Sequence, residues 1–103
     1  MIKHIVFWRF LELTAEGSRK DNIKQAQKLL LAMKDKIEGI IDLKVGENIQ
    51  NDENASDIVL IITFTDIEAL KIYQNHPAHL EVKDFLSKVR YERRVIDYEI
   101  KDL

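Results

Sequence analysis

Two segments of the chain are apolar on both of the faces that a β-strand presents. Both are rich in β-branched and aromatic residues, which favours strands. They are "KHIVFWRFL" at residues 3–11 and "DIVLIITFT" at residues 57–65. Because successive side chains of a strand point to opposite faces, Val6 and Trp8 share one face of the first segment, and Ile5 and Phe7 share the other. A sheet that contains these strands must therefore be covered on both sides.

Outside these strands, apolar residues recur at the three- and four-residue spacing that is typical of helices. Three stripes of this kind are present: Ile23, Ala26, Leu30, Met33 and Ile37; then Ile67, Leu70 and Tyr73; then His79, Val82, Leu86 and Val89. We expect Gly39 to end the first helix, Asp66 to cap the second, and Pro77 to separate the second from the third.

Two further strands are predicted from shorter apolar patterns. They are "IIDLKVGEN" at residues 40–48 and "RRVIDYEI" at residues 93–100. The order of elements is then β-α-β-β-α-β, which is the order of the ferredoxin-like fold. Right-handed crossovers put all the helices on one side of a four-stranded antiparallel sheet. We therefore expect one α+β domain over residues 1–103.

The helices of this fold can cover only one of the two apolar sheet faces. The other face, which bears Ile5, Phe7 and Leu11, would be a large exposed apolar patch in a monomer. Soluble monomers rarely expose such a patch. The simplest solution is a homodimer in which two sheets pack face to face through these residues.

Composition excludes several classes of protein. The chain has no cysteine, so it has neither a disulfide framework nor a cysteine-based zinc site. It shows no signal peptide and no membrane span, which predicts a cytoplasmic protein with no membrane partner. The net charge is −2, and the basic cluster "RYERR" at 90–94 is interpreted as a solvated structural element, so no nucleic-acid partner is expected. No phosphate loop, flavin motif or haem signature is present, and we expect no cofactor.

The candidate chemistry surrounds the only proline. Tyr73 ends one inward stripe and His79 begins the next, so both are expected to face the sheet. If the strand face of His4, Val6 and Trp8 looks toward the helices, these residues line one small apolar pocket. An imidazole exchanges protons near neutrality because its ordinary pKa is about 6.5. A phenol donates a hydrogen bond to a developing enolate.

Each of these residues also has a structural interpretation. Asn75 or His76 can simply cap the helix that starts at Pro77. His79, Tyr73 and His4 can be buried groups that pack without a catalytic role. The pair of imidazoles in "HPAH", with His4 as a third ligand, could form a zinc site. That signal is weak because the chain has no HExxH pattern, so we expect no metal.

Several segments together resemble the stress-responsive A/B-barrel (Dabb) family. The matching segments are "IKHIVFWRF" at the start, "VGENI", "DIVLIITFTDIEALKIYQNHPAHLEV" and "VIDYE" near the end. They span nearly the whole chain, and the long central segment is quite specific. The resemblance implies a dimeric α+β barrel of ferredoxin-like protomers, and it implies little about activity.

Around the opening motif the chain is similar to one plant branch of the family, the olivetolic acid cyclase-like polyketide cyclases. These enzymes close a linear polyketide by a cofactor-free aldol condensation. The resemblance implies that Tyr73 and His79 are catalytic and that His4 and His76 lie in or near the same pocket. Val6 and Trp8 share the strand face of His4, so we expect them to bind substrate together with His4 and His76. In one departure from this pattern, Asp57 stands where the cyclase has a histidine. The pocket-lining residues of the first helix also differ.

Three functions remain open from the sequence. The first is a cofactor-free lyase or cyclase that acts on a carbonyl or aromatic compound. The second is a non-catalytic dimeric protein that binds a ligand or is associated with stress. The third, indicated only by Trp8 and by the shared barrel fold, is a cofactor-free monooxygenase.

Overall fold

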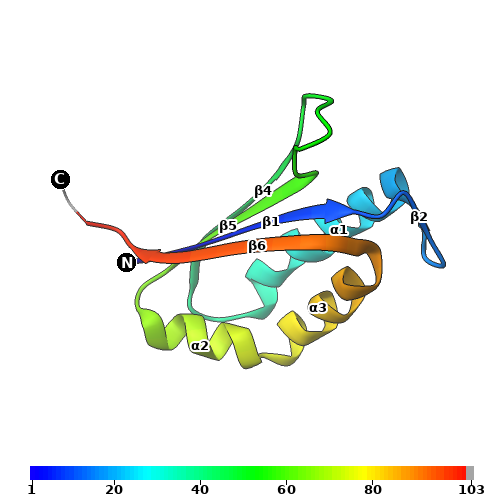
Figure 1. Ribbon diagram of the computed structural model, residues 1–103. Helices are drawn as coiled ribbons and strands as arrows, with labels where there is room; N and C mark the ends of the chain where they lie inside the picture. Colours follow the sequence, from blue (N-terminus) through cyan, green and yellow to red (C-terminus); the bar gives the residue numbers. More distant parts are fainter. Residues whose placement is uncertain (102–103) are drawn as a thin grey trace.

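A four-stranded antiparallel sheet with the strand order β4-β5-β1-β6 organises the computed structural model, which describes residues 1–101 (Figure 1). The strands of the sheet are β1 (Ile2–Phe10), β4 (Ile40–Glu47), β5 (Ile58–Phe64) and β6 (Arg90–Glu99). Two short strands, β2 (Leu13–Thr14) and β3 (Gly17–Ser18), form a separate hairpin. The helices are α1 (Arg19–Lys36), α2 (Ile67–Asn75) and α3 (Pro77–Val89).

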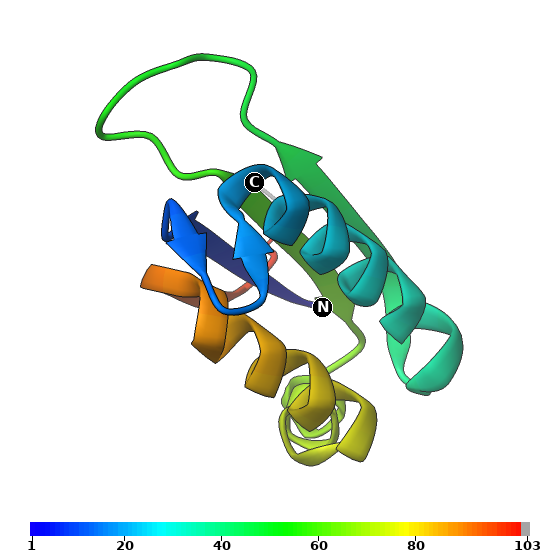
Figure 2. The same ribbon diagram turned by 90° about the vertical axis from the view of Figure 1, so that its right-hand side faces the viewer.

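All three helices lie on one face of the sheet, as Figures 1 and 2 show from two sides. The two central strands are β5 and β1, the segments that are apolar on both faces. β6 starts three residues earlier than predicted and forms one edge. The ferredoxin-like arrangement that the element order predicted is therefore confirmed.

Side-chain caps begin the first two helices, and the cap at Asp66 is the one that the sequence predicted. The hydroxyl of Ser18 accepts a hydrogen bond from the backbone N–H of Asp21 and begins α1. The carboxylate of Asp66 accepts one from the N–H of Ala69, at 2.9 Å, and begins α2. Both contacts satisfy amide groups that have no partner inside the helix. Gly39 has a φ of +93°, a backbone conformation that favours glycine, and turns the chain from α1 into β4.

One residue of the predicted helix stripes was placed wrongly. Ile67 was expected to face the sheet, and it is 53% exposed. The buried residues of α2 are Ala69, Leu70 and Tyr73. Ile67 is the first residue of the helix, and the rotation of successive residues puts it on the flank of this buried stripe. The small side chain of Ala69 takes the inward position instead.

The inner face of the sheet packs on the helices and forms the core. The buried apolar strand residues are Val6, Trp8, Phe10, Leu43, Ile58, Leu60, Ile62 and Phe64. The helices contribute the predicted stripe of α1 and the Val82, Leu86 and Val89 positions of α3. The strand face that carries His4 therefore looks toward the helices, which is the condition for a shared pocket.

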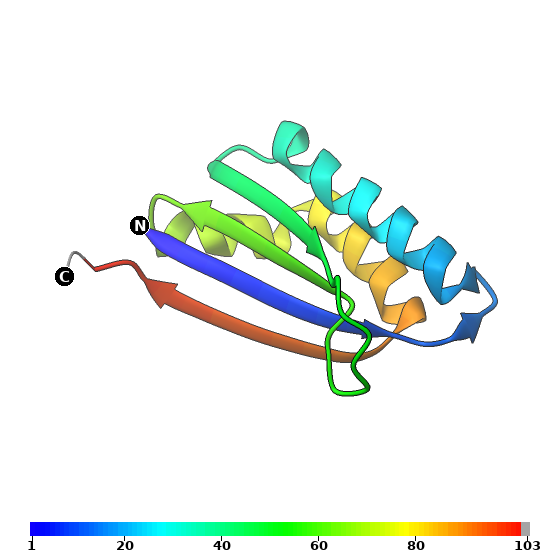
Figure 3. The ribbon, with the colours of Figure 1, turned by 90° about the horizontal axis from the view of Figure 1, so that it is seen from above.

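The outer face of the sheet carries no helix, and the loop between β4 and β5 rises over the end of β1 on this side (Figure 3). Its central residues are apolar. In the strand register Ile5 lies between Ile61 of β5 and Ile96 of β6. Phe7 pairs with Val59 and is 40% exposed. Leu11, which was predicted to share this face, follows the end of β1 and is also exposed. Within residues 1–101, no helix has both the length and the apolar character needed to cross a membrane.

Candidate functional site

A pocket of about 520 Å³ lies under the sheet, between α3 and the edge strand β6. β1 forms its floor with His4, Val6 and Trp8. Its remaining walls are lined by Leu30, Tyr73, Gln74, Asn75, His79, Val82, Lys83, Leu86, Ser87, Arg90 and Arg93. This volume is within the usual range for sites that bind small molecules.

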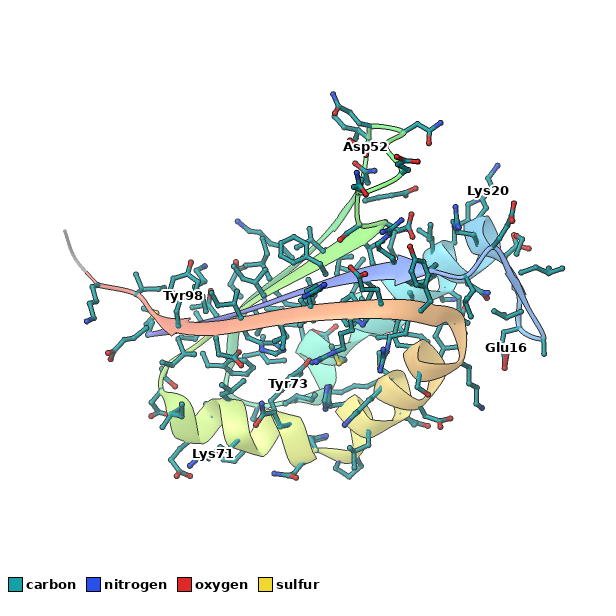
Figure 4. All side chains as sticks on the ribbon, in the orientation of Figure 1. Glu16, Lys20, Asp52, Lys71, Tyr73 and Tyr98 are labelled. Carbon is teal, nitrogen blue, oxygen red and sulfur yellow. The ribbon has the colours of Figure 1, made fainter. Side chains whose placement is uncertain are left out.

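Tyr73 lies at the centre of the polar part of this pocket. It is in the last turn of α2 and points toward the sheet, whereas Lys71 points away from it (Figure 4). The Tyr73 ring centroid is 4.3 Å from that of His79 and 5.5 Å from that of His4. The structure therefore brings the tyrosine and two histidines into one cluster, from α2, α3 and β1.

The phenol of Tyr73 stays protonated and is accessible from the pocket. Burial raises the pKa of Tyr73 well above its ordinary value, while Arg93 lowers this pKa and Asp97 raises it. Within residues 1–101 the hydroxyl makes no hydrogen bond, and no fully buried side-chain nitrogen or oxygen lacks a partner. The hydroxyl is therefore not sealed in the core and can donate to a ligand.

His79 is positioned as a neutral imidazole. It is in the first turn of α3, and its Nδ1 lies 3.2 Å from the carbonyl oxygen of Gln74. Because a carbonyl oxygen can only accept, Nδ1 carries the proton and donates, which leaves the lone pair of the neutral ring on Nε2. Burial lowers the pKa of His79, the carbonyl oxygen of Gln74 raises it, and the electrostatic effects of His4, Lys83 and Arg93 lower it further.

His4 is held by a carboxylate on the neighbouring strand. Its side chain is only 3% exposed, and its Nδ1 is hydrogen-bonded to Asp97 of β6, its direct partner in the strand register. This contact orients the ring and places a proton on Nδ1. The rings of His4 and Tyr73 are in an edge-type contact, so Asp97 and His4 together help to position the phenol ring.

A lowered pKa of His79 gives a direct prediction for titration. In the ligand-free protein, the imidazole proton resonances of His79 should titrate with a midpoint below the ordinary value of 6.5, since burial and nearby cations disfavour the charged ring. NMR titration, with the His79 signals assigned by their loss in His79→Asn, measures this midpoint. Lys83→Gln removes one of the cations and should raise it. A midpoint at or above 6.5 in the native protein contradicts the prediction.

His76 and Asp57 lie outside the pocket lining. Nδ1 of His76 accepts a hydrogen bond from the N–H of Ala78 at 3.0 Å, so the predicted capping role of His76 is confirmed. The carboxylate of Asp57 accepts one from the N–H of Phe10 at 2.7 Å. The departure from the plant cyclases at Asp57 therefore falls at a structural contact. Among the described residues, no three histidine or carboxylate side chains are grouped so that they could hold a metal ion.

Four charged residues of the site were missed in the sequence. Lys83, Arg90 and Arg93 line the pocket, and Asp97 holds His4. Arg90 and Arg93 belong to the basic cluster that was interpreted as a solvated element. The period-two pattern of β6 was the available signal, because it places Arg93, Val95 and Asp97 on one face. Whether this face of β6 looks toward the helices or away from them depends on the pairing with β1.

The fold and the pocket define a ferredoxin-like α+β protein with a tyrosine–histidine cluster under its sheet. The chain belongs to the stress-responsive A/B barrel domain family, whose model matches residues 2–100. The family resemblance seen in the sequence is thus confirmed. No curated protein sequence matches the chain.

Several solved structures share this fold at low sequence identity. A dimeric protein of ferredoxin-like fold from Bacteroides fragilis is 24% identical, with a TM-score of 0.80 over 96% of this chain and 95% of that chain. The Arabidopsis thaliana protein At3g17210 is 22% identical, with a TM-score of 0.83 over 100% and 98%. A hydroxynitrile lyase from Passiflora edulis is 20% identical, with a TM-score of 0.79 over 99% and 94%. At these identities the likeness establishes the fold alone.

Proposed function

We propose that the protein is a cofactor-free enzyme of the lyase or cyclase class that acts on a carbonyl compound. The observation that carries this proposal is the direct contact between the Tyr73 phenol ring and the His79 imidazole inside one pocket. One group stays protonated at neutral pH and the other stays unprotonated, because burial shifts their pKa values in opposite directions. Such a pair supplies a hydrogen-bond donor and a base at the same point.

In the proposed reaction His79 removes a proton from the carbon beside a carbonyl group. Nε2 of His79 takes this proton, and the electron pair of the C–H bond forms an enolate. The O–H of Tyr73 donates a hydrogen bond to the enolate oxygen, where negative charge develops. The enolate carbon then forms a C–C bond to a second carbonyl of the same molecule. The resulting alkoxide takes the proton back from His79, so neither proton nor electron is left over.

The remaining predicted site residues have supporting roles in this proposal. Val6 and Trp8 line the floor and contact the apolar body of the substrate. His4, held by Asp97, orients Tyr73. His76 has no role in the reaction, because its ring caps α3. The hydroxynitrile lyase of the same fold supports the proposal that this fold is compatible with lyase chemistry. It assigns no role to individual residues of this chain.

We further propose that the protein is a homodimer through the outer sheet face. The support is the apolar surface around Ile5, Phe7 and Ile96, on the sheet face that carries no helix. The Bacteroides fragilis protein of this fold is described as dimeric. Two such sheets packed face to face form a dimeric α+β barrel, and the pocket then lies on the opposite side of each sheet.

The catalytic proposal is tested by proton exchange, which requires no knowledge of the natural substrate. The probe is β-benzoylpropionate, a stable keto acid, in heavy water with ¹H NMR detection. We expect the protein to accelerate the exchange of the protons beside the ketone, because enolate formation is the first step. The matched control is His79→Ala, which removes the base. If the probe binds and its exchange is not accelerated, the protein is a binding protein and the catalytic proposal is overturned.

A further inference from the structure

Three cationic side chains surround the pocket close to the tyrosine–histidine pair. Lys83 is one helical turn after His79 on α3, so both lie on the same side of that helix. Arg93 lines the pocket from β6, and Arg90 lines it where α3 passes into β6. Lys83 and Arg93 are exposed and Arg90 is half-buried, so they form the mouth of the pocket.

Within residues 1–101 none of these three cations is paired with a carboxylate. Their neighbours outside the pocket are paired: Lys88 lies 3.3 Å from Asp84, and Arg94 lies 3.6 Å from Glu92. Among the described residues, no aspartate or glutamate lines the pocket. The nearest carboxylate on this face of β6, that of Asp97, is bound to His4.

The positive charges of Lys83 and Arg93 act on the two groups that are proposed to react, Tyr73 and His79. Arg93 affects the pKa of both Tyr73 and His79, and Lys83 affects that of His79. An anionic group placed between Lys83 and Arg93 is therefore adjacent to the site of chemistry, and it reduces the repulsion between these cations. Guanidinium and ammonium groups form charge-assisted hydrogen bonds to oxyanions that are stronger than neutral ones.

We propose that the substrate is a carboxylic acid, bound with its carboxylate between Lys83 and Arg93, supported by Arg90, and with its apolar body against Val6, Trp8 and Leu86. A carboxylic acid is ionised to its carboxylate at neutral pH because its ordinary pKa is about 4. The placement of a reacting carbonyl beside Tyr73 and His79 rests on the proposed function. The anion subsite itself rests only on the unpaired cations and on the pocket that they line.

The test is a binding measurement by calorimetry with β-benzoylpropionate and with its neutral amide. The two probes have nearly the same shape and differ by one charge. We expect the acid to bind about tenfold more tightly than the amide. Arg93→Gln should weaken binding of the acid by about tenfold, and Lys83→Gln by about threefold, because an ammonium group cannot form the bidentate hydrogen bonds that a guanidinium forms to a carboxylate. Neither substitution should change binding of the amide. Raising the salt concentration should weaken the binding of the acid and leave the binding of the amide unchanged.

The matched control is Lys88→Gln, which removes the same charge from the same helix outside the pocket. It should leave the affinity for the acid unchanged, and circular dichroism should show all variants folded. Equal affinity for acid and amide overturns the subsite, as does an equal loss in Lys88→Gln and Lys83→Gln. Tighter binding of phenyl phosphate than of the acid overturns the assignment to a carboxylate.

The subsite and the proposed function fail in different experiments. Charge-dependent binding without accelerated proton exchange overturns the catalytic proposal and supports the subsite. Accelerated exchange on the acid and the amide alike, with equal affinity, supports catalysis and overturns the subsite. Repeating the calorimetry with His79→Ala separates the two further, because this variant lacks the base and retains Lys83, Arg90 and Arg93.

Discussion

Replacing His79 by alanine is expected to reduce the rate of proton exchange on a bound keto acid by a factor on the order of 10²–10⁴, the usual loss when a general base is removed. Tyr73→Phe keeps the ring that packs against His4 and His79 and removes the O–H that would stabilise the enolate oxygen. Its loss is expected on the order of 10²–10³, as for a single oxyanion donor. Both effects are measured by ¹H NMR at saturating probe.

Two control variants change the same chemical groups outside the pocket. His76→Asn removes an imidazole and keeps a residue that caps helices well, so α3 should still begin at Pro77. Tyr91→Phe removes a phenol hydroxyl from a residue that does not line the pocket. Both should retain the native exchange rate. Full activity in His79→Ala and Tyr73→Phe, with both variants folded, contradicts the assignment of base and donor.

Phe7→Glu is expected to convert the protein from a dimer to a monomer. The substitution places a carboxylate at the centre of the outer sheet face, next to Val59 and across from Arg94 of β6. Burying one charge without full compensation costs several kcal/mol, about a thousandfold or more in the dimer dissociation constant. Sedimentation velocity at micromolar concentration measures the change, since the native protein should sediment as a dimer.

The control for this substitution is Leu13→Glu. Leu13 is in the small hairpin, outside the four-stranded sheet, and is 76% exposed. Leu13→Glu adds the same charge in place of an exposed leucine, outside the proposed interface, so the dimer should persist. A native protein that sediments as a monomer, or a Phe7→Glu variant that remains dimeric, places the interface elsewhere. Proton exchange measured on the monomeric variant then shows whether the pocket is complete in one protomer.

Much of the fold could be predicted because its information is local. The two strongly apolar strands, the stripe of α1, the cap at Asp66 and the break at Pro77 each depend on residues close together in the sequence. The prediction that Ile67 faces the sheet was wrong, and this residue is at the first position of a helix. There the three- and four-residue spacing fits two adjacent stripes equally well, and the packing of Ala69 against the core decides between them.

Only some of the site residues could be predicted from the sequence, and the reason is geometric. Tyr73, His79, His4, Val6 and Trp8 lie on stripes whose apolar neighbours indicate the buried side. Arg93 and Asp97 lie on an edge strand in which no residue is fully buried, so hydrophobicity does not indicate which side faces inward. The pairing with β1 decides it. That pairing sets Arg93 opposite Trp8 and Asp97 opposite His4, which the sequence of β6 alone does not reveal.

The edge position of β6 has a consequence for how this protein can change over evolution. Alternate residues of the strand belong to two different surfaces: Arg93 and Asp97 to the pocket side, and Arg94 and Ile96 to the outer face. Point substitutions can therefore alter ligand preference and self-association separately, although the codons are adjacent. A single-residue insertion or deletion within the strand would exchange the two sets, and both traits would be lost together. Divergence along this strand should accordingly proceed by replacement, with its length held constant.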